Sequence, residues 1–218
     1  MAITAKDVQK LREMTGVGMM DCKKALTASD GDMDKAVEFL REKGLAASAK
    51  KAGRVAAEGM AYAAVIDGVG VVVEVNAETD FVGKNEKFVD FVKGVAATVA
   101  ANKPADLEAL MACKYNGTDL TVEQQQQEMV LVIGENMKIN RFAFRTADHG
   151  ACSSYVHMGG KIGVLVEFSF DKAETAQADA FKTFAHDVAM QVAAVAPICA
   201  RREDVPAETI EHEMSIYK

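Results

Sequence analysis

A chain of 218 residues is long enough for one large domain, or for two to three small ones, with a buried core. Half of the residues are apolar, only 3 are proline and 26% are charged, which predicts a folded globular protein. The net charge of −7 argues against a nucleic-acid-binding protein, and no apolar run is long enough to cross a bilayer. We expect no direct contact with nucleic acid, no membrane attachment, and no signal or transit peptide.

The cysteines and histidines form none of the spaced pairs that bind zinc. They are Cys22, Cys113, Cys152, Cys199, His149, His157, His186 and His212. We expect four reduced thiols, as in a cytosolic protein, with no metal site and no cofactor. The chain lacks a nucleophile elbow, a phosphate loop and a dinucleotide-binding glycine pattern, which argues against an enzyme and leaves no catalytic residue to name. A hydrolase that uses Glu78 and Asp80 is a weaker alternative, because a solvated charge cluster explains the same residues.

The start of the chain predicts three short helices. Thr4 and Asp7 have the spacing of a capping box, and apolar residues then recur at helical intervals. A Gly16-Val17-Gly18 break and an Asp30-Gly31-Asp32 turn separate the helices. Gly44 predicts the end of the third helix, before a basic helical linker.

Charge is unevenly divided between this N-terminal module, residues 1–54, and the rest of the chain. The module holds 11 Lys and Arg against 8 Asp and Glu, whereas residues 55–218 hold 14 against 24. This division suggests a polarised protein-binding surface, although solvated faces give the same counts. Three helices in so few residues make a marginally stable bundle, which is typical of an appended binding module.

The remainder of the chain contains an internal repeat. When the sequence is shifted by 93 residues, residues 61–101 align with residues 154–194 without a gap. The identical pairs include Tyr62 and Tyr155, Gly70 and Gly163, Glu74 and Glu167, Phe88 and Phe181, Phe91 and Phe184, and, just beyond, Pro104 and Pro197. Low complexity explains matches between alanines but not matches between these residue types.

Each copy predicts a hairpin, a loop and a helix. The first hairpin, residues 60–66 and 70–76, surrounds the favoured turn pair Asp67-Gly68, and an apolar stripe from Phe88 to Val99 predicts a helix. The other predicted elements are strands near 154–159 and 162–170, a helix over about 174–195, a helix over 122–137, a strand over 139–144 beside the second hairpin, and a last helix from Pro206. We infer an α+β fold with two related antiparallel sheets, divided into residues 1–54, 55–145 and 146–218.

The two copies differ most between strand and helix. The first copy reads NAETDFVGKNEK over residues 76–87, whereas the second is an ordinary polar connection. Phe81 would tuck onto its own helix as a hydrophobic staple in one interpretation, with Thr79 or Asp80 as the cap. Because the second copy builds the same connection without an aromatic residue, we favour an exposed anchor for a partner protein, with Val82 beside it.

These residues resemble the elongation factor Ts family. Residues 11–26, LREMTGVGMMDCKKAL, resemble one of its signatures, and residues 74–84, EVNAETDFVGK, resemble another. Residues 155–157 and 161–166 resemble the hairpin of its C-terminal subdomain, and the repeat resembles its duplicated core. The likeness covers essentially the whole chain, and it implies that the N-terminal module is ubiquitin-associated-like.

The resemblance also implies a function and its residues. The family promotes release of GDP from elongation factor Tu in the cytoplasm. It forms a heterodimer with the GDP-bound and nucleotide-free forms of that protein, and the resemblance does not decide whether this chain also associates with itself. Phe81 would enter an apolar pocket of the GTPase while Asp80 disturbs the groups that hold Mg²⁺, with Thr79 and Val82 beside them. The other implied contacts are Val17, Met19, Met20 and Lys23 in the N-terminal module, and His157 and Met158 in the second hairpin.

The sequence departs from the family pattern at a few positions. Ala77 and Gly83 replace other small residues, and Gly83 would loosen the loop. Residues 211–218 resemble the beginning of a helical insertion, so we expect a C-terminally truncated member. A ubiquitin-like-binding adaptor, suggested by the three helices and the Gly16–Met19 turn, is the alternative from another functional class.

Overall fold

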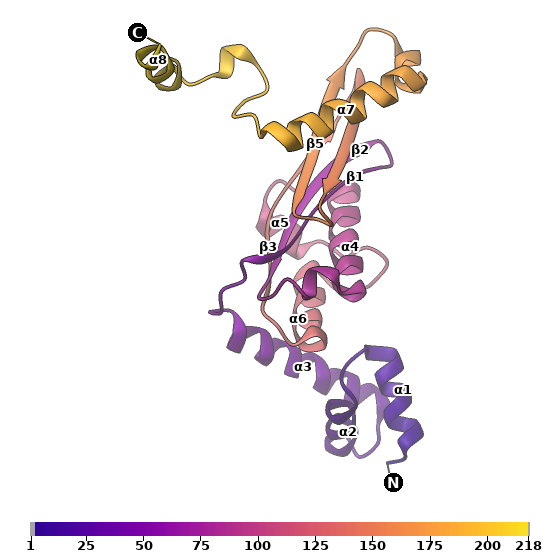
Figure 1. The fold of residues 1–218 in the computed structure, drawn as a ribbon. Coiled ribbons are helices and arrows are strands. Elements are labelled where there is room, and N and C mark those ends of the chain that lie inside the picture. The colour runs from indigo at the N-terminus through magenta and orange to yellow at the C-terminus, as the bar shows by residue number, and fades with distance from the viewer. Residues whose placement is uncertain (1–2, 218) are drawn as a thin grey trace.

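A computed structural model describes residues 3–217 and has an α+β fold, as predicted: three N-terminal helices precede antiparallel sheets with helices (Figure 1). The helices are α1 (Ala5–Thr15), α2 (Met19–Ala28), α3 (Met33–Lys51), α4 (Glu86–Asn102), α5 (Leu107–Ala112), α6 (Val122–Ile133), α7 (Asp179–Val195) and α8 (Ala207–Ile216). The strands are β1 (Glu58–Ile66), β2 (Val69–Ala77), β3 (Met137–Thr146), β4 (Gly150–His157) and β5 (Ile162–Ser169). Short 3-10 helices are η1 (Val82–Lys84), η2 (Ala173–Gln177) and η3 (Arg202–Asp204).

Local signals account for the boundaries of the first helices. The Thr4 side chain accepts a hydrogen bond from the Asp7 backbone N–H, and the Asp7 carboxylate accepts one from Thr4, so the predicted capping box forms. Gly16 ends α1 in the left-handed conformation, and Asp32 caps α3. Their buried side chains form one small core: Val8, Leu11, Val17, Cys22, Ala25, Leu26, Ala36 and Leu40.

The predicted helix end at Gly44 is wrong, because α3 continues to Lys51. Gly44 is buried where α3 crosses α6, and a Cβ atom there would lie 3.3 Å from the Gln127 carbonyl oxygen (Figure 1). The glycine therefore allows two helices to approach closely instead of ending one of them.

A three-stranded antiparallel sheet of order β1-β2-β3 forms the centre of the molecule. The predicted turn joins β1 to β2, with positive φ at both Asp67 and Gly68, as a type I′ turn requires. The strand predicted beside the second hairpin is β3, and that placement is wrong because β3 pairs with β2 along its whole length. The apolar side chains of β2 and β3 then share one core with α4, α5 and α6.

Helix α4 lies against this sheet, and the 113–121 segment closes over it. Tyr115 stacks on Phe91 at a ring-centroid distance of 5.8 Å, and its hydroxyl donates to the Asp90 and Phe91 carbonyl oxygens at 3.3 Å. Burial, with a smaller contribution from the Asp90 carboxylate, raises the pKa of Tyr115 to about 12, so the hydroxyl stays protonated. Gly94 leaves the space that this ring occupies, since a Cβ there would lie 1.9 Å from the Tyr115 oxygen.

We expect Gly94→Ala to destabilise the protein by about 1–3 kcal/mol, because the new methyl group displaces the Tyr115 ring. In an unconstrained helix interior the same change stabilises by about 0.5–1 kcal/mol, so the sign itself is diagnostic. Urea unfolding followed by circular dichroism measures the change. Gly53→Ala, in the turn after α3 where a Cβ meets open space, is the control for the added methyl group alone, and a Gly94→Ala protein as stable as wild type would contradict the packing.

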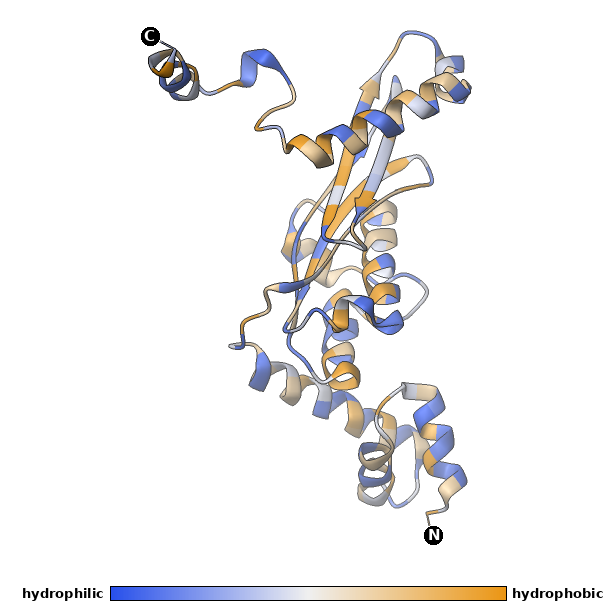
Figure 2. Ribbon diagram, in the orientation of Figure 1, coloured by the Kyte–Doolittle hydropathy of each residue, from blue (hydrophilic) through white to orange (hydrophobic). Residues whose placement is uncertain are grey.

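The second half repeats the hairpin-and-helix arrangement with less cover. Strands β4 and β5 form a two-stranded sheet against β1, and α7 packs on both strands. Among the described residues of α7, only Ala185 and Ala189 are buried, whereas α4 is buried along one whole side by α5, α6 and the sheet. Apolar side chains of α7 therefore stay exposed, among them Phe184, Met190 and Val195, and Figure 2 shows apolar and polar residues alternating along this helix.

Beyond α7 the chain leads through η3 to α8, which projects from the rest of the molecule (Figure 1). The predicted start of this helix is confirmed, because Pro206 directly precedes Ala207 as its N-cap. Within residues 3–217, no helix combines the length and apolar character needed to span a membrane.

Candidate partner-binding site

The Phe81 loop, residues 78–81, joins the end of β2 to η1. The Phe81 side chain is 81% exposed, and Asp80 beside it is also exposed. The staple interpretation is therefore wrong for Phe81, and Asn85, not Thr79 or Asp80, caps α4. The loop presents an aromatic ring and a carboxylate to solvent.

Val82 differs from the expectation of an exposed neighbour. Its side chain is only 6% exposed and belongs to the same core as Phe88. The chain thus turns inward immediately after Phe81, and η1 begins at the buried residue. Val82 fixes the base of the loop, and Asp80 and Phe81 are its exposed side chains.

In the N-terminal helices the exposed candidates are Met19, Met20 and Lys23, all in the first half of α2. Val17 differs, because its side chain is 4% exposed and lies in the core of this module. The exposed residues line a groove of about 960 Å³ between α1 and α2, and Lys87 of α4 also lines it. The Lys87 Nζ donates to the Gly16 carbonyl oxygen at 3.1 Å, which ties this module to the helix that follows the Phe81 loop.

In the second half, His157 is the exposed last residue of β4, and Met158 is exposed in the turn that leads to β5. The Tyr155 hydroxyl lies 2.8 Å from His157 Nδ1, which orients the imidazole. The turn is anchored on β1, because the Ala61 backbone N–H donates to the Gly160 carbonyl oxygen at 2.7 Å.

The beginning of β1 connects this turn to the Phe81 loop. A Cβ at Gly160 would meet Met60 at 2.7 Å, and a Cβ at Gly83 would meet the Gly59 carbonyl oxygen at 3.1 Å. Both close approaches use adjacent residues of one strand. The three sets of candidate residues are therefore joined by short, direct contacts through β1 and through Lys87.

Sequence reasoning missed Glu135 and Asn136, which hold the Phe81 loop from the segment between α6 and β3. They lie 56 and 58 residues from their partners Thr79 and Glu78, and no local pattern marks such a pairing. Glu78 also faces Arg54, with Oε1 at 3.4 Å from the guanidinium. The Glu78 carboxylate accepts a hydrogen bond from the Asn136 backbone N–H at 2.6 Å. These contacts give Glu78 a structural role, which weakens the argument for Glu78 as an acid or base in a hydrolase.

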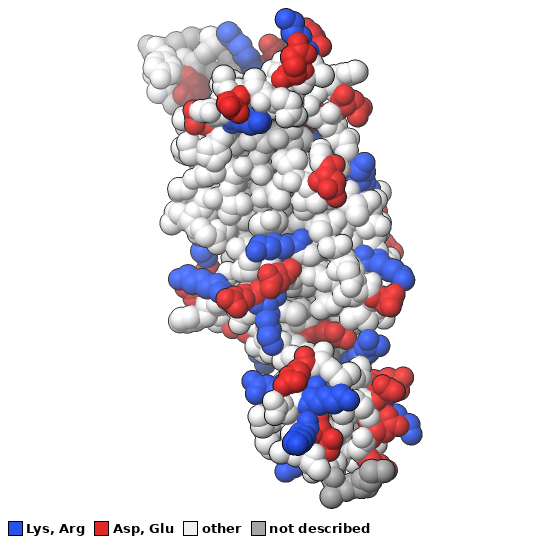
Figure 3. All heavy atoms as spheres, turned by 90° about the vertical axis from the view of Figure 1, so that its right-hand side faces the viewer, with Lys and Arg blue, Asp and Glu red and all other residues white. Residues whose placement is uncertain are grey.

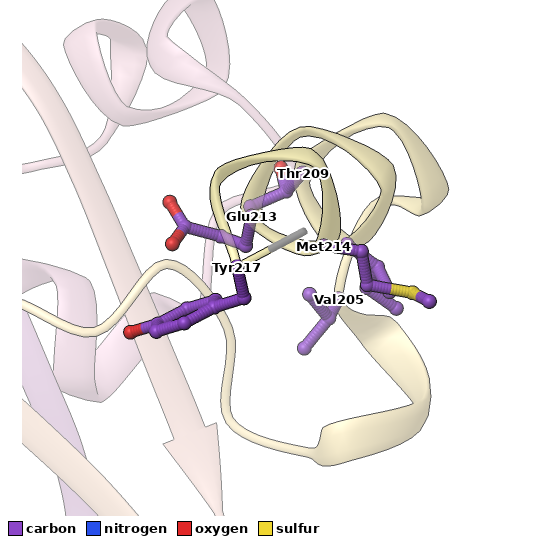
Figure 4. A pocket seen from close by; sticks show the side chains of 6 residues that line it. Val205, Thr209, Glu213, Met214 and Tyr217 are labelled. Carbon is purple, nitrogen blue, oxygen red and sulfur yellow. The ribbon is translucent and has the colours of Figure 1, made fainter.

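Two surface features bear on other classes of ligand. Basic and acidic side chains are interspersed over the face drawn in Figure 3, which shows no extended basic area for a phosphate backbone. A shallow apolar hollow on α8 is lined by Val205, Thr209, Ile210, Glu213, Met214 and Tyr217 (Figure 4). All of these residues come from one helix and the turn before it, so the hollow is not built between separate elements.

In residues 3–217, no three His, Cys, Asp or Glu side chains gather to hold a metal ion.

An exposed aromatic residue on a loop held at both ends, with further exposed methionines on the N-terminal helices, is typical of a protein that binds another protein. The family profile described as "Elongation factor TS" matches residues 78–218. The chain is 54% identical over 221 residues to elongation factor Ts of Trichlorobacter lovleyi, covering all of this chain and 71% of that protein. It is 49% identical over 219 residues to elongation factor Ts of Clostridium novyi, covering 99% of this chain and 70% of that protein.

The chain therefore belongs to the elongation factor Ts family of translation elongation factors, and the predicted resemblance is confirmed. Members of this family are nucleotide-exchange factors without covalent chemistry, so the hydrolase alternative is set aside.

Proposed function

We propose that this chain promotes release of GDP from elongation factor Tu by inserting the Phe81 loop into the GTPase. The observation that carries the proposal is the exposed Phe81 ring next to the exposed Asp80 carboxylate, on a loop whose two ends are fixed within the chain. An aromatic side chain at the centre of an interface commonly contributes much of the binding energy. In the proposed complex, this loop lies against the nucleotide-binding domain of elongation factor Tu.

The mechanism divides the work between the two exposed residues. Phe81 enters an apolar pocket between helices of the GTPase and holds them apart. Asp80 brings a negative charge toward the groups that hold Mg²⁺, and loss of Mg²⁺ leaves the phosphate charge of GDP uncompensated. GDP then dissociates faster, since the cation and the phosphate contacts supply much of its affinity.

Two further contacts position the loop. Met19, Met20 and Lys23 bind a second helix of the same GTPase domain, and methionine suits such an adaptable contact. His157 and Met158 contact another domain of the partner. Val17 and Val82 are buried in the two cores and support these surfaces from within the chain.

The proposal includes an organisation of the chain. Residues 1–54 form a ubiquitin-associated-like module, and residues 55–145 and 146–218 form two subdomains that arose by duplication. The hairpin, 3-10 helix and 17-residue helix that recur in the same order in both halves support the duplication. The protein acts in the cytoplasm, as a heterodimer with elongation factor Tu.

The proposal is tested by its thermodynamic consequence. If the chain weakens the binding of GDP, then GDP must weaken the binding of the chain by the same factor. In isothermal titration, the chain is expected to bind nucleotide-free elongation factor Tu more tightly than the GDP-bound form, by the factor by which it weakens GDP affinity. Equal affinity of the chain for the GDP-bound and nucleotide-free forms would overturn the proposed exchange function. Binding to ubiquitin-like proteins, with none to elongation factor Tu, would favour the adaptor alternative.

A further inference from the structure

The residue before Asp80 is held by one carboxylate from a distant part of the chain. The Thr79 backbone N–H donates to Glu135 Oε2 at 2.9 Å, and the Thr79 hydroxyl donates to Glu135 Oε1 at 2.7 Å. Both oxygens of the Glu135 carboxylate are thus engaged by a single residue of the Phe81 loop. Hydrogen bonds to an ionised acceptor are shorter and stronger than neutral ones.

The neighbouring residues bond in the opposite direction. The Asn136 backbone N–H donates to Glu78 Oε1 at 2.6 Å, and the Asn136 side-chain amide donates to the Arg54 carbonyl oxygen at 2.8 Å. Residues 78–79 and 135–136 therefore hold each other through reciprocal side-chain to backbone bonds, and we call this set the clasp. Asn136 is almost fully buried and the other three residues are half-buried, so the bonds are partly shielded from water.

The clasp fixes the loop on one side and Val82 fixes it on the other, with only Asp80 and Phe81 between them. A loop held at both ends loses little conformational freedom when it binds, which raises affinity and places its side chains accurately. In the second half, the residues that correspond to Glu78 and Thr79 are Asp171 and Lys172, both exposed. The clasp is thus confined to the half that presents the aromatic residue.

We infer that Glu135 is a positioning residue for nucleotide exchange, which acts on the GTPase only through Thr79 and the Phe81 loop; this inference rests on the proposed function. Glu135→Ala removes both acceptor oxygens, so it is expected to slow GDP release from elongation factor Tu by about 10- to 100-fold at saturating factor. Thr79→Val removes only the hydroxyl bond, so its effect is expected to be smaller. Thr79→Ser retains both bonds and is expected to exchange at a rate close to wild type.

The matched control is Glu42→Ala, an exposed glutamate on α3 that forms no side-chain hydrogen bond or ion pair within residues 3–217. Hydrogen exchange of the free protein supplies a readout independent of the GTPase. The Thr79 amide is expected to exchange faster in Glu135→Ala than in wild type or Glu42→Ala. Unfolding midpoints of all variants, measured in urea, ensure that rates are compared between folded proteins.

A double-mutant cycle separates the inference from the proposed function. If Glu135 acts through the loop, Glu135→Ala slows release in the wild-type background but adds little to Phe81→Ala. Equal slowing in both backgrounds, or an unchanged rate for Glu135→Ala when Phe81→Ala is slow, would overturn the positioning role alone. An unchanged rate for Phe81→Ala would overturn the proposed function, and the positioning role with it.

Discussion

Phe81→Ala is expected to slow the release of GDP from elongation factor Tu by about 30- to 700-fold, which corresponds to losing about 2–4 kcal/mol of interface energy. The same change is expected to alter the free energy of unfolding by no more than about 0.5 kcal/mol, because the ring is largely exposed in the free protein. Phe81→Ala is therefore expected to reduce exchange activity while leaving the stability of the protein nearly unchanged. Stopped-flow release of a fluorescent GDP, together with urea unfolding, measures both.

The repeat supplies the control for this variant. Glu174 occupies the position in the second half that corresponds to Phe81, lies in η2 and is exposed. Glu174→Ala is expected to leave GDP release close to the wild-type rate. Comparable slowing by both variants would contradict a specific role of the Phe81 loop.

The second large effect concerns stability. Phe91→Ala is expected to lower the free energy of unfolding by about 3–5 kcal/mol, because its ring is 2% exposed and stacks on Tyr115. Phe184 corresponds to Phe91 in the second half, but it is 58% exposed and lies 6.1 Å from the Phe168 ring. Phe184→Ala is expected to lower the free energy of unfolding by about 1 kcal/mol or less.

Urea unfolding of the two variants under the same conditions gives the comparison directly, provided that the slope with denaturant is unchanged. Equal losses at the two phenylalanines would show that α7 is covered as fully as α4. That result would contradict the uneven burial of the two halves.

Sequence alone predicted most elements whose boundaries depend on nearby residues. The capping box at Thr4, the type I′ turn at Asp67-Gly68 and the apolar face of α4 each depend on interactions within a few residues. The predicted helix end at Gly44 was wrong because a glycine that ends a helix and a glycine that admits a neighbouring helix look alike in sequence. The predicted strand partner of β3 was wrong because the order of strands in a sheet depends on contacts between residues far apart in the chain.

The same distinction applies to the candidate site. The second copy builds the connection between strand and helix without an aromatic residue, and this comparison predicted that Phe81 is exposed. The structure confirms the exposure of Phe81. The sequence did not predict that Val17 and Val82 are buried. Nothing in the sequence shows whether an apolar residue next to an exposed one points into the core or into solvent. Glu135 was missed because its bond to Thr79 spans 56 residues.

The central claim is that this chain accelerates release of GDP from elongation factor Tu. The most direct measurement is the rate at which purified elongation factor Tu, loaded with fluorescent GDP and chased with excess unlabelled GDP, loses its nucleotide with and without the chain. The rate is expected to rise with the concentration of the chain and then to saturate. A rate that does not depend on the chain at any concentration would contradict the claim.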